Sequence, residues 1–331
     1  MERFAFIAAV TFAIIWGVVA MAGHGNFGIH IDGEDFGGTD PIVEVAAGRM
    51  EAQSFSGEGL RIKHAAAHVT ITPEDRQDFL IEIVNPGRAP MPVVTADEGR
   101  VVIDGRLRGR VGNCRDGGGA DLRGYGELTL ADLPQINIRS PRGLELEVGG
   151  ASTTEVGPSE SVNLDFTGCG AASFGDVSDA FEVDIAGSGD VRAGAMRTFS
   201  ADVAGSGTVA VGAVGESADI DIAGSGEVTI ASLNGSLSTD GAGSGSVAVQ
   251  GGAVTTAKIE LAGSGDVSIA APVRTLDVSI LGSGDVDVAG EVGDLDAEIA
   301  GSGSVSARAV TGASHREIMG SGEVTIGAPS P

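Results

Sequence analysis

The sequence predicts an all-β protein that folds as a single-stranded parallel β-helix, a solenoid with about 19 residues per rung. The first observation is a repeated triplet, Gly-Ser-Gly, which begins at Gly187, Gly205, Gly224, Gly243, Gly263, Gly282, Gly301 and Gly320. The steps between copies are 18, 19, 19, 20, 19, 19 and 19 residues, and a degenerate copy, Gly168-Cys169-Gly170, lies 19 residues before the first. A fixed short period of this kind is typical of rungs stacked on one another.

The second observation is a set of apolar columns on both sides of the triplet. Two residues before the first glycine stand Ile185, Val203, Ile222, Gly241, Leu261, Ile280, Ile299 and Ile318. Four residues after it stand Val191, Val209, Val228, Val247, Val267, Val286, Val305 and Val324. Inward residues at alternate positions indicate pleated strands. Each rung is therefore expected to be a strand, a glycine corner, a second strand and a variable turn, coiled in the right-handed sense.

The third observation is the composition. The chain has 331 residues, of which 54 are glycine and only 4% are aromatic, so small and β-branched side chains must fill the interior. There are 46 acidic against 20 basic residues, a net charge of -26. Nucleic acid is excluded as a partner because binding it requires Lys and Arg to neutralise phosphates. Cations, basic surfaces and uncharged polymers remain compatible with this charge.

The N-terminus predicts export. Residues 4–22 form an uncharged apolar run that ends in Ala20-Met21-Ala22, which favours a signal peptide over residues 1–22. The alternative is an uncleaved anchor, because 19 residues are close to the length that spans a bilayer. Residues 23–59, rich in glycine and acids, are expected to be a flexible acidic tether. Its two histidines and its acids lack the spacing of a known metal site.

Residues 60–148 are predicted to be an N-terminal β segment that caps the solenoid, because short apolar alternations end there at turn residues. An Arg/Gly-rich stretch, 104–126, interrupts it. We expect an ordinary solvated surface insertion, with docking on the chain's own acidic face or contact with an external anion as alternatives. The repeat helix occupies 149–327. The tail 328–331 contains two prolines and is expected to protect the far edge.

Cys114 and Cys169 are the two cysteines of the chain. In an exported protein they are expected to form a disulfide. The alternative is two free thiols, with Cys169 replacing the serine of a repeat.

Acidic columns flank the corners and are the candidate binding positions. Three residues before the first glycine stand Asp184, Asp202, Asp221, Asp240, Glu260, Glu298 and Glu317, with Ser279 as the exception. Three residues after it stand Asp190, Glu227, Asp266, Asp285 and Glu323. Stacking would turn the columns into carboxylate ladders, and calcium prefers such oxygen ligands. A calcium ladder and a solvated acidic face are both compatible with this pattern. We expect no catalytic residue and no other cofactor.

The rungs, of the form [ADE]-[VI]-A-G-S-G-[DE]-V, resemble the bacterial GIN-domain family, described as head domains of auto-transporter adhesins. The resemblance covers roughly residues 50 to 327. It implies a β-helix at the cell envelope, in the periplasm, at the outer membrane or on the cell surface, with an adhesion-type or scaffolding role. After Gly327 the sequence has no series of amphipathic strands such as a translocator barrel needs, so another route to the surface is expected.

Two classes of function compete. The first is a non-catalytic envelope protein that presents a repetitive acidic face to a polysaccharide or a protein surface. The second is a polysaccharide lyase or hydrolase, since several such enzymes are β-helices. An enzyme would break the repeat locally to gather acids, bases and aromatics in one cleft. The rungs are nearly interchangeable here, which favours the non-enzyme. Membrane contact is expected only through residues 4–22, if they are not cleaved.

Overall fold

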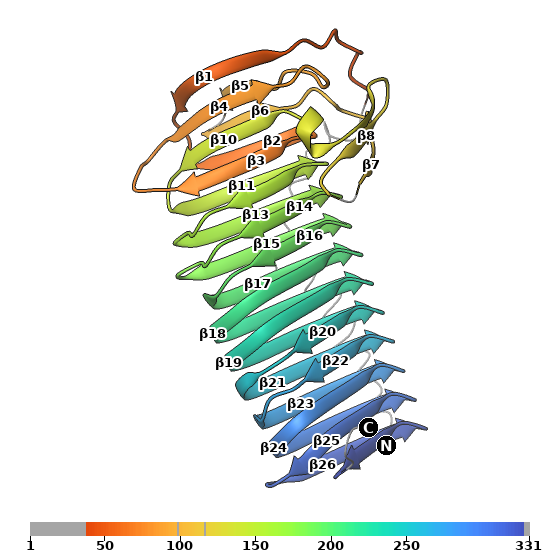
Figure 1. Ribbon diagram of the computed structural model, residues 1–331. Helices are drawn as coiled ribbons and strands as arrows, with labels where there is room; N and C mark the ends of the chain where they lie inside the picture. The colour runs from red at the N-terminus through yellow and green to blue at the C-terminus, as the bar shows by residue number, and fades with distance from the viewer. Residues whose placement is uncertain (1–37, 98, 116, 328–331) are drawn as a thin grey trace. The chain divides into compact units, whose positions relative to one another are not determined.

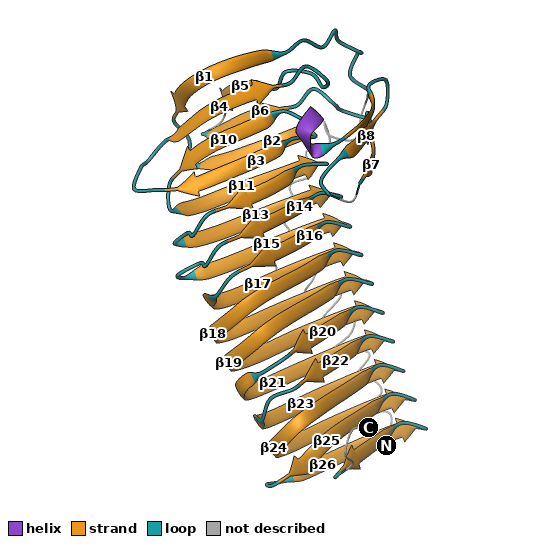
Figure 2. Cartoon of the chain, in the orientation of Figure 1, coloured by secondary structure: helices purple, strands orange, loops and turns teal. Residues whose placement is uncertain are grey.

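The computed structural model describes residues 38–97, 99–115 and 117–327, and almost all of its regular structure is β-strand (Figure 2). The one helical element among the described residues is a single 3-10 turn, η1 (Leu130–Asp132). Within these ranges no helix is long and apolar enough to cross a membrane. The expected signal or anchor over 1–22 and the tail 328–331 lie outside the described residues.

Parallel rungs make up most of the structure (Figure 1). The first arm of successive rungs is formed by β11 (Gly143–Gly150), β13 (Ser161–Gly168), β15 (Ala180–Gly187) and β17 (Met196–Gly205), then by the later parts of β18 (Thr208–Gly224) and β19 (Glu227–Gly243), β21 (Gly252–Gly263), β23 (Val273–Gly282), the later part of β24 (Asp285–Gly301), and β26 (Ser314–Gly320). The second arm is formed by β12 (Thr153–Val156), β14 (Ala171–Phe174), β16 (Asp190–Ala193), the first parts of β18, β19 and β24, β20 (Ser246–Val249), β22 (Asp266–Ile269), β25 (Ser304–Val310) and β27 (Glu323–Ile326).

The register of the stack follows the sequence repeat. Gly187 pairs with Gly168 on one side and with Gly205 on the other, and Val209 pairs with Val191 and Val228. Identical positions of neighbouring rungs therefore stand directly above one another, at the roughly 4.8 Å spacing of paired strands. The all-β solenoid with a period near 19 residues is confirmed. Its hand stays a prediction.

The core is one continuous column of aliphatic side chains between the two arms. The predicted inward positions are buried: Ile185, Val209 and Val228 have an exposed fraction of essentially zero. The column loses its cover at the last rung, where Ile318 is 42% exposed. Buried apolar area contributes roughly 25 cal/mol per Å², so this column supplies most of the stabilisation.

The corners require glycine for steric reasons. The first glycine of each triplet has a positive φ, for example 130° at Gly187 and 129° at Gly205. The serine N–H of each corner donates to the carbonyl of the first glycine in the preceding rung, as from Ser206 to Gly187 at 2.8 Å. The serine hydroxyls of two neighbouring corners, Ser264 and Ser283, also lie 3.0 Å apart.

The solenoid begins earlier than the sequence indicates. β2 (Gly59–Ala65) and β3 (His68–Pro73) form a complete rung in parallel register with β11 and β12. Its corner is Ala65-Ala66-Ala67, which replaces the glycine triplet and therefore hides the rung from a search for the repeat. Part of the 60–148 segment is thus solenoid rather than a separate cap.

The N-terminal end is closed by strands of mixed direction. On the first arm, β6 (Arg100–Asp104) is parallel to β2, and β5 (Val93–Asp97) is antiparallel to β6. On the second arm, β10 (Gln135–Ser140) is parallel to β3, β4 (Phe79–Asn85) is antiparallel to β10, and β1 (Gly48–Phe55) is antiparallel to β4. Strand β1 corrects the expectation of a tether through residue 59: residues 48–55 belong to the sheet.

The Arg/Gly-rich stretch also differs from the solvated insertion that we expected. It contains a small antiparallel sheet of β7 (Val111–Cys114), β8 (Ala120–Leu122) and β9 (Gly126–Leu128). Leu107, Leu122 and Leu128 are buried in a second, smaller core that packs on the alanines of the first corners. We call residues 104–128 the side lobe. A disulfide between Cys114 and Cys169, with 5.7 Å between their Cα atoms, joins the lobe to the degenerate corner of the solenoid.

Candidate binding face of the solenoid

Outward side chains of the first arm form an acidic row along the stack. The register joins Glu147, Asp165, Asp184, Asp202, Asp221, Asp240, Glu260, Ser279, Glu298 and Glu317 in consecutive rungs. All are partly buried except Glu317, which is exposed at the last rung. We call this line the inner acidic row. It includes every predicted first-arm acid, and it extends the prediction by two rungs toward the N-terminus.

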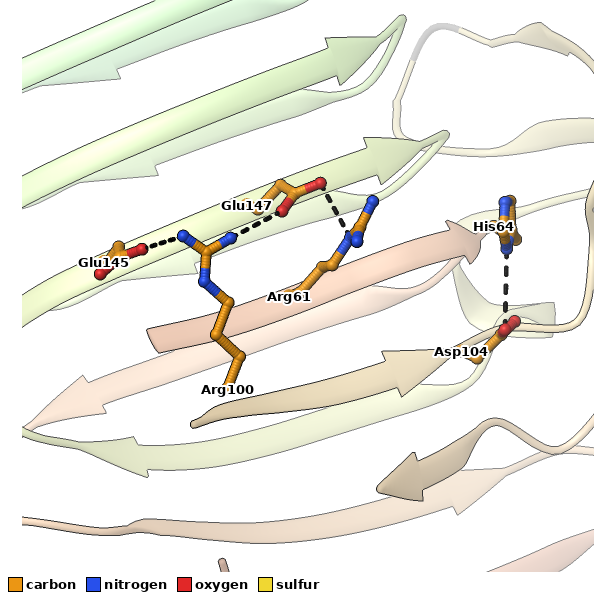
Figure 3. Close-up of polar contacts among 6 residues, drawn as sticks. All are labelled: Arg61, His64, Arg100, Asp104, Glu145 and Glu147. Atoms are coloured by element: carbon orange, nitrogen blue, oxygen red, sulfur yellow. Dashed lines mark hydrogen bonds and ion pairs between the residues drawn. The ribbon is translucent and has the colours of Figure 1, made fainter. Parts of the chain in front are cut away.

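Arginines close this row at its N-terminal end. Arg61 occupies the next position of the stack, and its Nε lies 2.9 Å from a carboxylate oxygen of Glu147. The other oxygen of Glu147 lies 3.4 Å from the guanidinium of Arg100, which also pairs with Glu145 (Figure 3). The charge of the row is thus neutralised at one end, while the middle rungs have only acidic neighbours along the stack.

A second outward row lies two residues earlier on the same arm. Its members in register are Glu145, Asn163, Glu182, Ser200, Asp219, Ser238, Lys258, Asp277, Asp296 and His315. Its acids are exposed to solvent. Lys258 is a basic exception, and its Nζ lies 2.6 Å from Glu260 of the inner row. We call the two rows together the acidic face.

The repeat pattern does not reveal the second row, because its residue type changes from rung to rung. The inner row was found as a nearly constant column of Asp and Glu. A count of acids at every position of the 19-residue period would have found Glu182, Asp219, Asp277 and Asp296 in one column.

Partial burial and mutual repulsion raise the affinity of the inner row for protons. Burial, then the neighbouring Asp202, raises the pKa of Asp184 to about 7. Burial, then Asp202 and Asp240, raises the pKa of Asp221 to about 7. Both carboxyls also share a hydrogen bond with Asp202, so a proton on either outer carboxyl can bridge to it. At neutral pH the row therefore carries less than its formal charge.

The second-arm acids make a weaker line. Asp190, Glu227, Asp266 and Asp285 are exposed, and the register places Thr208 and Ser246 between the first three. Their oxygens serve local contacts instead: Asp285 accepts the backbone N–H of Ser304 at 2.9 Å and its hydroxyl at 2.6 Å. These contacts link neighbouring rungs.

The predicted calcium ligands do not form a metal site in the part of the chain that the structure describes. There, no group of three or more His, Cys, Asp or Glu side chains is placed to hold a metal ion. The predicted ligands are divided between two arms, and on each arm a rung contributes at most one carboxylate to a row. A calcium ladder stays an alternative to a solvated acidic face.

The arginines of the side lobe contact other residues of the lobe and the nearby Asp40. The Arg110 guanidinium donates to the carbonyls of Asp40 and Arg123, and Arg115 pairs with Glu127. The backbone N–H of Arg108 donates to the Asp40 carboxylate at 2.8 Å. These contacts tie residue 40 and the lobe together, and none of them reaches the acidic face.

One partly buried pair, His64 and Asp104, marks the junction between the solenoid and the lobe. His64 has a φ of 47° and lies at the register shift where β2 turns into its corner. Its Nδ1 lies 3.7 Å from Asp104 (Figure 3). Burial alone would raise the pKa of Asp104, but the nearby His64 and a hydrogen bond from the backbone N–H of Arg106 outweigh it and lower that pKa. The pair stabilises the start of the lobe.

Comparison with solved structures finds matches of low sequence identity. A "putative adhesin" from Parabacteroides distasonis ATCC 8503 is 16% identical, with 86% of this chain and 99% of that chain covered and a TM-score of 0.45. A "putative lipid binding protein" from the same organism is 17% identical, with 86% and 98% covered and a TM-score of 0.37. A "putative adhesin" from Parabacteroides merdae ATCC 43184 is 14% identical, with 86% and 96% covered and a TM-score of 0.38.

No curated protein matches the chain. The assignment rests on the family comparison, which covers the whole repeat region in two overlapping segments, residues 131–253 and 238–330. The matched segments include the acidic rows and all eight glycine corners. The chain belongs to the family described as "Putative auto-transporter adhesin, head GIN domain".

Proposed function

We propose that this protein is a non-catalytic, adhesin-like component of the bacterial cell envelope that binds cationic surfaces through its acidic face. The observation that carries the proposal is the in-register stack of carboxylates from Glu147 to Glu317, backed by the exposed second row. Membership of an adhesin family supports an exported, surface-binding role. Location in the periplasm, at the outer membrane or on the cell surface is part of the proposal.

A surface that binds through many weak contacts needs charges that repeat at a regular spacing. Charges that recur at about 4.8 Å along a rigid stack meet a polymer or a surface at many points at once, so weak contacts add up. The parallel ladders hold the carboxylates in position before binding, which reduces the ordering cost. The partner chemistry that fits is a basic protein surface or a polysaccharide that carries amino groups.

Two features favour a binding protein over a polysaccharide-active enzyme. The phenylalanines of the solenoid, Phe166, Phe174, Phe181 and Phe199, are all at least 94% buried and cannot stack on a sugar at the surface. The acids of the face recur from rung to rung, whereas glycoside hydrolysis requires two carboxyls in different surroundings. Cleavage of acidic or neutral polysaccharides by the purified chain would overturn this part of the proposal.

Retention on charged beads tests the proposal. We expect the chain to bind amine-coated beads and not carboxylate-coated beads, and to be released as salt is raised, because contacts between exposed charges are screened. Equal retention on both bead types, or retention that is insensitive to salt, would contradict it.

A further inference from the structure

A hollow lies on the outward side of the second arm, at the N-terminal end of the solenoid. Its volume is about 190 Å³, and its polar lining comes from three neighbouring strands, β3, β10 and β4. The polar side chains of the lining are those of Thr70, Thr72, Glu82, Asn137 and Arg139. This surface belongs to the other arm of the rung and shares no residue with the acidic face.

Strand register builds the hollow as a small grid. Asn137 is paired with Thr70 on one side and with Glu82 on the other. Two residues further along, Arg139 is paired with Thr72 and with Leu80. Directly paired residues of neighbouring strands point to the same face and lie about 5 Å apart. The short threonines therefore leave space between longer neighbours.

A β-bulge contributes the wall of the hollow. The register of β1 against β4 shifts between Met50 and Gln53, and Ala52, inside that shift, lines the hollow. Bulges bend a strand and re-aim its side chains. This is the region in which the parallel repeat gives way to antiparallel strands, so the hollow has no equivalent among the regular rungs.

The charges around the hollow leave one cation unpaired. Glu82 pairs with Arg49, and Glu155, beside Thr70 in the next rung, has His68 at 3.7 Å. Within the described residues, Arg139 has no ion pair, and the side chains of Thr70 and Asn137 make no hydrogen bond. Arg139 is exposed, so its guanidinium is accessible to an anion that enters the hollow.

We propose that this hollow binds a single uronic-acid unit of an acidic polysaccharide. The Arg139 guanidinium is suited to a carboxylate because its parallel N–H groups match the two oxygens. Thr70, Thr72 and Asn137 offer donors and acceptors for sugar hydroxyls, and Leu80 and Ala52 offer an apolar wall to the ring. A volume below the roughly 300–1,000 Å³ of sites for larger ligands fits one ring rather than a chain segment.

Titration of the purified chain with glucuronate, glucose and acetate, followed by ligand-observed NMR, tests the proposal. Glucuronate should bind in the millimolar range, and glucose and acetate should each bind at least about tenfold more weakly, because each lacks one half of the recognised chemistry. Arg139→Gln should weaken glucuronate binding by about tenfold or more, the usual effect of losing a charge-assisted hydrogen bond. Thr70→Val should weaken it less.

Arg192→Gln is the matched control. Arg192 is an exposed arginine on the outward side of the same arm, in β16, and it does not line the hollow. The Arg192→Gln substitution should leave glucuronate binding unchanged, as should substitutions in the acidic face. No glucuronate binding by the unsubstituted chain, equal binding of glucuronate and acetate, or equal losses in Arg139→Gln and Arg192→Gln would each overturn the proposal.

Discussion

A methyl group on Gly205 would lie 2.4 Å from the carbonyl oxygen of Gly187 in the preceding rung. The same carbonyl accepts the backbone N–H of Ser206 at 2.8 Å, so the contact that holds two corners together is also what excludes a side chain. The relationship recurs at each later corner, with corresponding distances between 2.0 and 2.4 Å. The glycines are therefore required by the approach of backbone to backbone.

We expect Gly205→Ala to lower the free energy of unfolding by at least about 2 kcal/mol, through overlap with the Gly187 carbonyl and a side chain at positive φ. Ser206→Ala, at the exposed tip of the same corner, should change it by less than about 0.5 kcal/mol. Denaturant unfolding of the two variants measures the difference. Equal effects would mean that the corner backbone can relax away from the contact.

The inner acidic row should make stability depend on pH. Asp184 and Asp221 have folded pKa values of about 7, raised from 3.8, so between about pH 4 and pH 7 the folded state holds protons that the unfolded state has lost. The free energy of unfolding must then fall as pH rises through this window. Thermal unfolding from pH 5 to pH 8 should show a decreasing Tm.

The paired variant Asp184→Asn and Asp221→Asn isolates the effect. It removes both titrating groups at nearly constant side-chain volume and should flatten the dependence of Tm on pH between pH 5 and pH 8. Asp190→Asn, on the exposed second arm, should leave it unchanged. A Tm that rises with pH in the unsubstituted chain would show that the row is fully ionised and compensated in another way.

Calcium should leave stability unchanged once ionic strength is held constant. The carboxylates of a row come one from each rung, and no group of three or more candidate ligands is assembled among the described residues. Asp285, a predicted ligand, already accepts two hydrogen bonds from Ser304. Tm measured with calcium and with a chelator should be equal. A rise of several degrees that saturates with calcium would restore the calcium ladder.

Breaking the disulfide should loosen the side lobe before the solenoid. Cys114 and Cys169 are 55 residues apart, and closing such a loop contributes on the order of 4 kcal/mol in the chain-entropy model. Because Cys114→Ser leaves the solenoid ladders intact, hydrogen exchange should accelerate in β7, β8 and β9 and remain slow in β18 and β19. Uniform acceleration across the chain would contradict a local role.

The 19-residue period and the recurrence of the same residue type at each position of the period were enough to predict most of this fold. A parallel stack has to place identical positions above one another, so the spacing of Gly187, Gly205 and Gly224 fixes both the rung length and the register. Inward and outward faces then follow from alternation. The inner acidic row was predictable for the same reason.

The N-terminal end of the solenoid, where strands run in mixed directions, was not predictable in the same way. The rung at 59–73 has Ala65-Ala66-Ala67 at its corner, and 69 residues separate it in sequence from β11, its neighbour in the stack. Strand β1 pairs directly with β4 although β2 and β3 lie between them in the sequence, so the contact leaves no local pattern. Its sequence, GRMEAQSF, lacks the alternation of a half-buried strand, because its residues are mostly exposed.

The most direct test of the acidic face is the affinity of the purified chain for poly-lysine at pH 8 and low ionic strength. The triple variant Asp202→Asn, Asp219→Asn and Asp240→Asn removes three charges from the acidic face. The control triple Asp190→Asn, Asp266→Asn and Asp285→Asn removes the same number from the second arm. The account predicts a large loss of affinity in the first variant and a small one in the control. Equal losses would show that net charge alone attracts the polymer and would contradict a binding role for the acidic face.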